Sequence, residues 1–180
     1  EAKVSLSVGP GAALDVPALL TQLDRYPYGC AEQTISRALP LLYSNDLSVG
    51  FGMKADAALK ERIEKSVTRV FAMQDSSGAF GVWGPSNPDI WLTSYVTDFL
   101  TRAREKAYRV DNRGFSQALS RLQNYVSYVS DFKTGGGKRA YALYVLARNA
   151  RAPIGELRYY VDARLSRLRR RLQKRNLALR

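Results

Sequence analysis

The residues best suited to chemistry are Cys30, the single cysteine of the chain, and Gln33, a carboxamide three positions later. If a helix begins near Cys30, both side chains lie on one face of it. A thiolate at Cys30 can then attack the side-chain carbonyl of Gln33. Loss of ammonia leaves an intramolecular thioester, an acyl group on a good leaving group. Spacing alone also fits an inert core cysteine, which is the common fate of lone cysteines in helices.

The residues around the pair favour the reactive interpretation. Unpaired backbone N–H groups at a helix N-terminus stabilise a thiolate and the oxyanion of a tetrahedral intermediate. Gly29 is expected to let the backbone turn tightly before the helix, and Pro27 stiffens the approach. Tyr26 and Tyr28 are expected to shield the bond from water. Glu32 is an early-turn carboxylate of the kind that the helix dipole favours, and the sequence assigns it no further role.

Helices are predicted to position this pair. Apolar residues recur at helical spacing in three stripes, and residues 140–147 are apolar nearly all round, as in a helix buried on most faces. Segments rich in Gly, Pro and Ser predict loops at 75–89 and 134–137. The stripes are Leu59, Ile63, Val67, Val70 and Phe71; then Trp91, Leu92, Tyr95, Val96, Phe99 and Leu100; then Phe115, Ala118, Leu119, Leu122, Val126 and Val129.

This pattern predicts an all-α fold of roughly seven helices joined by turns or loops. Strand-like alternation occurs only at 4–8, and a short helix capped by Asp15 is expected after Gly9 to Gly11. Alternation of buried and half-exposed helices favours antiparallel hairpins arranged around an axis, an α/α toroid. No internal repeat is strict enough to prove that arrangement.

Composition limits the other interpretations. One cysteine excludes an internal disulfide, and one cysteine without any histidine excludes a usual structural zinc site, so no cofactor is predicted. The net charge of +12 comes largely from the C-terminus, where eight basic residues and no acidic ones lie in 164–180. The start at Glu1, without a signal peptide or a long apolar run, suggests a piece of a longer protein.

The string from Tyr26 to Gln33 (YPYGCAEQ), continued by Ser36 to Tyr43 (SRALPLLY), resembles the thioester region of bacterial alpha-2-macroglobulins. These are relatives of the complement proteins and of animal alpha-2-macroglobulin. Ala31 stands where the family motif often has a second glycine. Residues 78–83 (GAFGVW) and 91–96 (WLTSYV) are similar to the family as well, and the resemblance covers about residues 1–163.

The resemblance implies a partial α/α toroid, a thioester-containing domain, with Cys30 and Gln33 as its reactive pair. It also implies a broad-spectrum endopeptidase inhibitor rather than an enzyme. A protease cuts a bait region, and the exposed thioester then acylates a lysine amine of that protease. Expected partners are target proteases and neighbouring domains of the parent, with no nucleic acid. The parent is expected in the periplasm, where many members are lipoproteins on the inner membrane. Its expected role is in bacterial defence. Because the chain has no histidine to relay the acyl group to hydroxyls, direct attack by amines is expected.

The basic tail at 164–180 departs from the family pattern and is separated from the helical domain at 1–163. One explanation is a reading-frame slip, since the family run Ala-Lys-Ala-Gln-Leu-Gly-Ala read one base later can give residues 173–179 (QKRNLAL). The other is an amphipathic basic helix with Leu165, Leu168 and Leu172 on one side.

Two other function classes stay open. Residues 74–80 (QDSSGAF) faintly resemble a repeat of triterpene cyclases, but the aspartate clusters that such enzymes need do not occur. A toroidal module whose basic tail contacts nucleic acid or an anionic membrane is the main alternative, although the tail has no interleaved aromatic residues. Phe80, Trp83 and Trp91 are expected to pack in the core, with a shield over the thioester as the second interpretation.

Overall fold

A computed structural model describes residues 29–50, 56–128 and 132–162 of the chain. No strand occurs in these ranges, so the all-α prediction is confirmed for them, and Gln74 and Phe80 form one isolated antiparallel bridge. The helices are α2 (Ala31–Gly50), α3 (Leu59–Phe71), α4 (Ile90–Glu105), α5 (Asn112–Tyr128), α6 (Phe132–Arg148) and α7 (Ile154–Tyr160).

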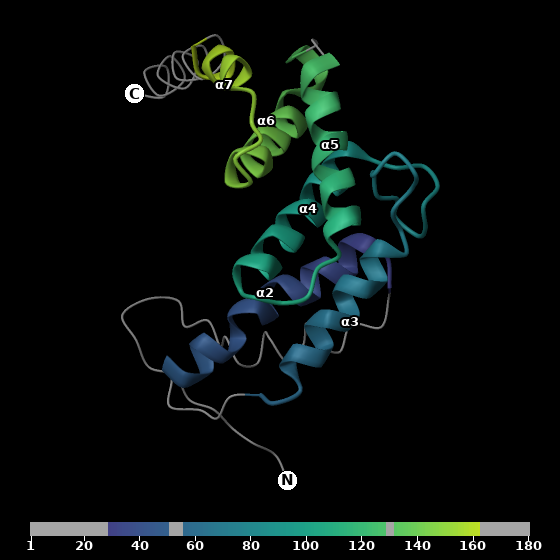
Figure 1. The fold of residues 1–180 in the computed structure, drawn as a ribbon, viewed down its shortest axis with the longest axis vertical. Helices are drawn as coiled ribbons and strands as arrows, with labels where there is room; N and C mark the ends of the chain where they lie inside the picture. The colour runs from purple at the N-terminus through teal and green to yellow at the C-terminus, as the bar shows by residue number, and fades with distance from the viewer. Residues whose placement is uncertain (1–28, 51–55, 129–131, 163–180) are drawn as a thin grey trace, which may run out of the picture.

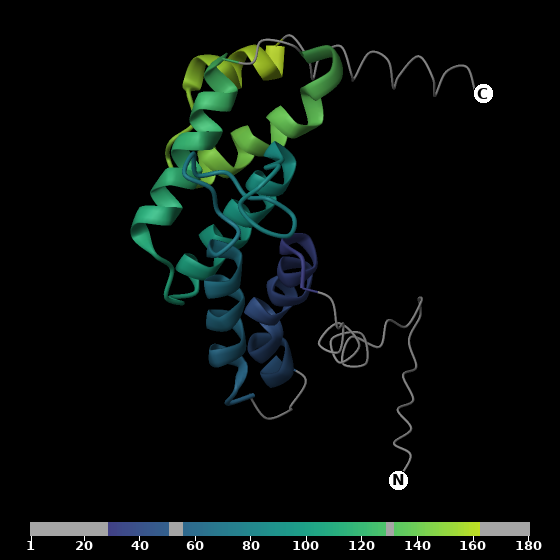
Figure 2. The same cartoon turned by 90° about the vertical axis from the view of Figure 1, so that its right-hand side faces the viewer.

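The helices form two layers. Helix α4 packs between α2 and α6, while α3 packs on α2, and α5 packs on both α4 and α6 (Figures 1 and 2). Consecutive helices therefore alternate between an inner row (α2, α4, α6) and an outer row (α3, α5). This is the order of antiparallel hairpins in an open part of an α/α toroid, as predicted.

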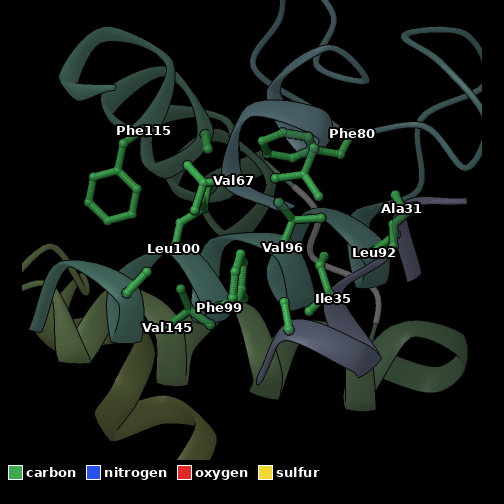
Figure 3. Packing of buried hydrophobic residues seen from close by; sticks show 14 of the residues in the cluster. Ala31, Ile35, Val67, Phe80, Leu92, Val96, Phe99, Leu100, Phe115 and Val145 are labelled. Atoms are coloured by element: carbon green, nitrogen blue, oxygen red, sulfur yellow. The ribbon is translucent and has the colours of Figure 1, made fainter. Parts of the chain in front are cut away.

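One hydrophobic cluster joins the layers, and the predicted stripes supply most of it (Figure 3). In helix α3 the buried residues are Leu59, Ile63, Val67 and Val70. Helix α4 is buried over most of its surface because it has neighbours on three sides. Its first residues differ from the prediction, since Trp91 is 41% exposed and Tyr95 is half-buried.

Helix α6 is longer than the sequence predicts. Residues 134–137, expected as a loop because of three glycines, lie inside it. A Cβ added at Gly136 or Gly137 would meet no atom within 4 Å, so no close contact requires glycine there. The helix is anchored by Ala142, Leu143, Val145 and Leu146, all buried, and this packing outweighs the cost of about 1 kcal/mol per glycine in its first turns.

The predicted loop at 75–89 is held by its own hydrogen bonds. The Asp75 Oδ1 accepts from the backbone N–H groups of Ser77 and Ala79, and Gly78 takes a left-handed φ of 86° between them. Phe80 is fully buried, and the side chain of Asp89 caps helix α4 by accepting from Leu92 N. The loop is therefore an ordered support beside the start of helix α2.

Several predictions lie outside the described residues: the strand at 4–8, the helix capped by Asp15, the roles of Tyr26 and Tyr28, and the nature of the 164–180 tail. Across the described ranges, none of the helices combines the length and apolar character needed to span a membrane.

Candidate functional site

Cys30 and Gln33 lie together at the N-terminus of helix α2. Cys30 occupies the N-cap position directly before Ala31. The Gln33 N–H donates to Cys30 Sγ, and the Cys30 N–H donates to Gln33 Oε1, each across 3.4 Å. This is the reciprocal pattern of a capping box, in which cysteine takes the place of the usual serine or threonine. The cap itself thus brings the sulfur and the carboxamide into one small region.

The pair sits at the edge of the core. Cys30 is 5% exposed, Ala31 is fully buried, and the side chain of Gln33 is partly exposed. The arrangement can carry out acyl chemistry, because a nucleophilic sulfur and a carbonyl carbon belong to the same turn. The Cys30 N–H already faces the oxygen that would carry negative charge after attack.

Gly29, directly before the cap, is fixed from helix α3. Its carbonyl accepts two hydrogen bonds from the guanidinium of Arg69, from Nε at 3.1 Å and from Nη2 at 2.9 Å. The φ of Gly29 lies outside the left-handed range, so the expected tight turn is not what requires glycine. A Cβ at this position would lie 1.7 Å from Arg69 Nη2. A side chain at position 29 and the guanidinium of Arg69 would therefore compete for the same space.

Two backbone contacts complete the support. The Ala31 N–H donates to the carbonyl of Val82 at 2.8 Å, which ties the first turn of α2 to the 75–89 loop. The Thr34 N–H donates to the Cys30 carbonyl at 2.9 Å, the first bond of the helix. The first turn of α2 is thus held both by α3 and by the loop.

The side chain of Glu32 bonds to Ser36, one turn further along α2. Its Oε1 accepts from Ser36 Oγ at 3.0 Å, and that hydroxyl lies 3.1 Å from the phenol oxygen of Tyr95. Tyr95 stacks on Trp91 with ring centroids 5.3 Å apart. Glu32, whose role the sequence left open, therefore anchors a polar link between α2 and α4.

The aromatic residues of the loop do not share one role. Phe80 packs in the core as expected, but Trp83 is 72% exposed and its neighbour Val82 is 39% exposed. The core interpretation is therefore wrong for Trp83, because residues 82–88 curve away from the cluster toward solvent. Trp91 is likewise part of the surface near the site.

Sequence reasoning missed Arg69, Ser36 and Tyr95 as parts of this site. The Cys-x-x-Gln spacing was a readable capping-box signal. No local signal marks Arg69, because it reaches Gly29 from 40 positions away.

A cavity of about 670 Å³ between α2 and α3 opens beside Gly29, Thr34 and Arg69. No group of three or more metal-ligating side chains occurs within the ranges that the structure describes.

Known proteins resemble this chain in sequence and in fold. The family model of the A-macroglobulin TED domain, the thioester-containing domain, matches residues 5–137. The Escherichia coli protein named Alpha-2-macroglobulin is 37% identical over 158 residues, covering 81% of this chain and 10% of that protein.

Solved structures agree with this likeness. The native conformation of E. coli alpha-2-macroglobulin has a TM-score of 0.74 at 33% identity, over 84% of this chain and 10% of that one. Salmonella alpha-2-macroglobulin reacted with methylamine has a TM-score of 0.73 at 31% identity, over 84% of this chain and 11% of that one. The chain spans about a tenth of the length of the curated relatives named here. The match of the family model over most of the chain, together with the all-α fold, places it in the bacterial alpha-2-macroglobulin family, as part of the TED domain.

Proposed function

We propose that this chain is the reactive part of a broad-spectrum protease inhibitor that captures proteases covalently through a thioester between Cys30 and Gln33. The observation that carries the proposal is the reciprocal cap in the first turn of α2, in which each of the two side chains accepts a hydrogen bond from the backbone N–H of the other residue. Membership of the alpha-2-macroglobulin family supports it. So do relatives described as reacted with methylamine, as activated by trypsin and as activated by porcine elastase.

Thioester formation begins with attack of the Cys30 sulfur on Cδ of Gln33. The C–S bond forms as the carbonyl electron pair moves onto Oε1, which the Cys30 N–H faces. Collapse of this intermediate breaks the Cδ–Nε2 bond, and the nitrogen leaves as ammonia with the proton that the thiol gave up. The bond formed is an activated ester that survives only where water is excluded.

Protease capture reverses the roles of sulfur and nitrogen. A lysine amine of the bound protease attacks Cδ, and the electron pair again moves onto Oε1. Collapse breaks the C–S bond, and the proton of the amine passes to the sulfur. The products are an amide between inhibitor and protease and a free Cys30 thiol. Since the chain contains no histidine, amines are expected to react directly and hydroxyl groups poorly.

The test uses the full-length protein that contains this segment. Intact mass is expected to be lower than the sequence mass by one ammonia, and methylamine should remove that deficit and release one thiol per molecule. Cys30→Ala should abolish both the deficit and the covalent protease adduct seen on denaturing gels. Gln33→Glu should also block formation, with Gln117→Glu as a control of equal charge change. An unmodified protein without the deficit, or a covalent adduct that persists in Cys30→Ala, would refute the proposal.

A parallel competition tests the mechanism. Methylamine and glycerol are added to the same protein at equal concentration, and thiol release is followed over time. Methylamine should react much faster. Equal rates would mean that another residue relays the acyl group, and the direct-attack mechanism would then fail while the thioester itself could stand.

A further inference from the structure

One peptide group links Arg69 to the oxygen at which the proposed chemistry develops charge. The Gly29 carbonyl accepts the two bonds from Arg69, and the Cys30 N–H of the same amide faces Gln33 Oε1. No cis peptide bond occurs in the described residues, so the carbonyl and the N–H point in opposite directions. Arg69 and Gln33 are thus bound to the two ends of a single amide dipole.

A guanidinium at the carbonyl end acts on that amide in two ways. The paired donors of arginine fix the plane of the peptide group, so the direction of the Cys30 N–H is fixed as well. The positive charge also polarises the amide, because hydrogen bonds in a chain strengthen one another. Both effects favour negative charge on Gln33 Oε1.

We propose that Arg69 is a positioning residue for the thioester chemistry, acting through the Gly29–Cys30 peptide to hold the N–H of Cys30 as the oxyanion donor. The inference rests on the proposed function. It adds to that function the oxyanion donor, the Cys30 N–H, and the residue that orients this donor, Arg69. The oxyanion on Oε1 arises both when sulfur displaces ammonia and when an amine displaces sulfur. Arg69 therefore assists both steps without touching the reacting atoms.

The same geometry couples the residue at position 29 to Arg69. The backbone at Gly29 does not take a left-handed φ, but a Cβ would overlap the Arg69 guanidinium. Alanine at position 29 must therefore displace Arg69 from the carbonyl. Removal of the arginine side chain should create the space that alanine needs.

The experiment measures methylamine-driven thiol release, per mole of thioester, in the full-length protein. Arg69→Ala should slow this reaction about tenfold, less than the loss of a direct oxyanion donor costs. Arg69→Lys keeps the charge but not the two parallel hydrogen bonds to the Gly29 carbonyl. Its rate should therefore lie between those of Arg69→Ala and the unmodified protein. The control is Lys65→Ala, which removes the same charge from the same helix one turn away, where Lys65 forms a solvent-exposed ion pair with Glu61. Its rate should match that of the unmodified protein.

A second set of variants tests the contact itself. Gly29→Ala should slow the reaction as Arg69→Ala does, and the double variant should react no more slowly than either single one. The melting temperature should change little in Arg69→Ala, because the side chain is exposed. Additive losses in the double variant would show that the two residues act independently and would overturn the inference.

The outcomes separate this inference from the proposed function. If the unmodified protein lacks the ammonia deficit, the thioester itself is refuted. If the deficit is present and Cys30→Ala removes it, but Arg69→Ala reacts as fast as the unmodified protein, only the role of Arg69 is refuted. A rate loss in Lys65→Ala equal to that in Arg69→Ala would likewise refute it, because the effect would then be one of general charge.

Discussion

At the scale of single residues, the proposed chemistry uses the two residues of an ordinary helix cap. In a usual capping box, a serine at the N-cap accepts from the N–H of the third helical residue. A glutamine at that third position accepts in turn from the N–H of the N-cap residue. Cys30 and Gln33 make the same two contacts. The capping box therefore holds in one turn the sulfur and the carboxamide that the proposed reaction would join.

A second residue-scale feature is the hydroxyl of Ser36, which joins Glu32 to Tyr95. Tyr95→Phe removes one hydroxyl and keeps the ring stacked on Trp91. It should lower the free energy of unfolding by about 1 kcal/mol, the usual net worth of one hydrogen bond. Ser36→Ala should cost a similar amount or slightly more. The double variant should lose less than the two single losses combined, because both remove the same link. Full additivity in urea unfolding would show that the contact between α2 and α4 contributes nothing.

At the scale of elements, a buried carboxylate joins the inner row of helices. Asp98 of α4 is 5% exposed and accepts from Arg102 on its own helix and from Tyr141 and Arg148 on α6. Arg102 also donates to Tyr43 of α2. Burial, together with the nearby Asp98 carboxylate, raises the pKa of Tyr141. The inner row is therefore held by a polar network as well as by the hydrophobic cluster.

Asp98→Asn tests this network. It keeps the shape of the side chain but leaves two guanidinium groups without their shared carboxylate, so it should destabilise the fold by about 3 kcal/mol. Glu105→Gln is the matched control, because Glu105 also pairs with Arg148 but its side chain is 47% exposed. It should cost less than about 1 kcal/mol in the same urea titration. Equal effects of the two variants would contradict the assignment of Asp98 as the centre of the network.

The cap of helix α4 predicts a dependence on pH. Burial acts to raise the pKa of Asp89, but the bonds from Lys138 and from the Leu92 N–H outweigh it, and the net pKa lies below the ordinary value. Asp89 therefore stabilises the fold above its unfolded pKa, about 3.9, and this contribution is lost as the pH falls through the lower folded pKa.

Asp89→Asn keeps the oxygen that accepts from Leu92 N but removes the charge. The variant should be less stable than the unmodified chain at neutral pH. The difference in stability between the two proteins should decrease as the pH is lowered from about 5 toward 2, because the Asp89 carboxylate takes up a proton in this range. Melting temperatures measured across this range check the prediction. A gap that stays constant with pH would mean that the charge of Asp89 does not contribute.

At the scale of the whole molecule, the turn that holds Cys30 and Gln33 begins α2, the first helix of the described residues. Trp83 and Trp91 are exposed on the two segments next to it. Thioesters persist only away from water, and among the described residues these two segments carry exposed apolar side chains beside the turn. The periplasmic location of the parent and the separation of the basic tail at 164–180 from the helical domain stay predictions from the sequence.

The isolated 180-residue chain is therefore predicted to carry no lasting thioester. Its Cys30 should be a free thiol, and Gln33 should be intact or hydrolysed to glutamate. Thiol titration should find one reactive group per chain in the unfolded state, and the same group, reacting more slowly, in the folded state, where Cys30 is 5% exposed. A blocked thiol together with a mass lower by one ammonia would contradict this expectation.

The sequence by itself determined the helical class, the buried stripes of α3 and α5 and the proximity of Cys30 to Gln33. These follow from periodicity and from the geometry of a single turn, which depend on neighbours along the chain. It also predicted the 75–89 loop, through its turn residues. The helical start of α6 was missed because packing of its later residues outweighs the low helix propensity of glycine.

Only the tertiary structure decided what surrounds the reactive pair. Arg69 meets Gly29, Tyr95 meets Ser36, and Val82 meets Ala31 across sequence separations that no local pattern encodes. At Gly29 the structure places a guanidinium in the space that a side chain would occupy, which the sequence could not indicate. The proposed chemistry is predicted from eight consecutive residues, but the contacts that support the first turn of α2 exist only once α3, α4 and the loop have packed against it.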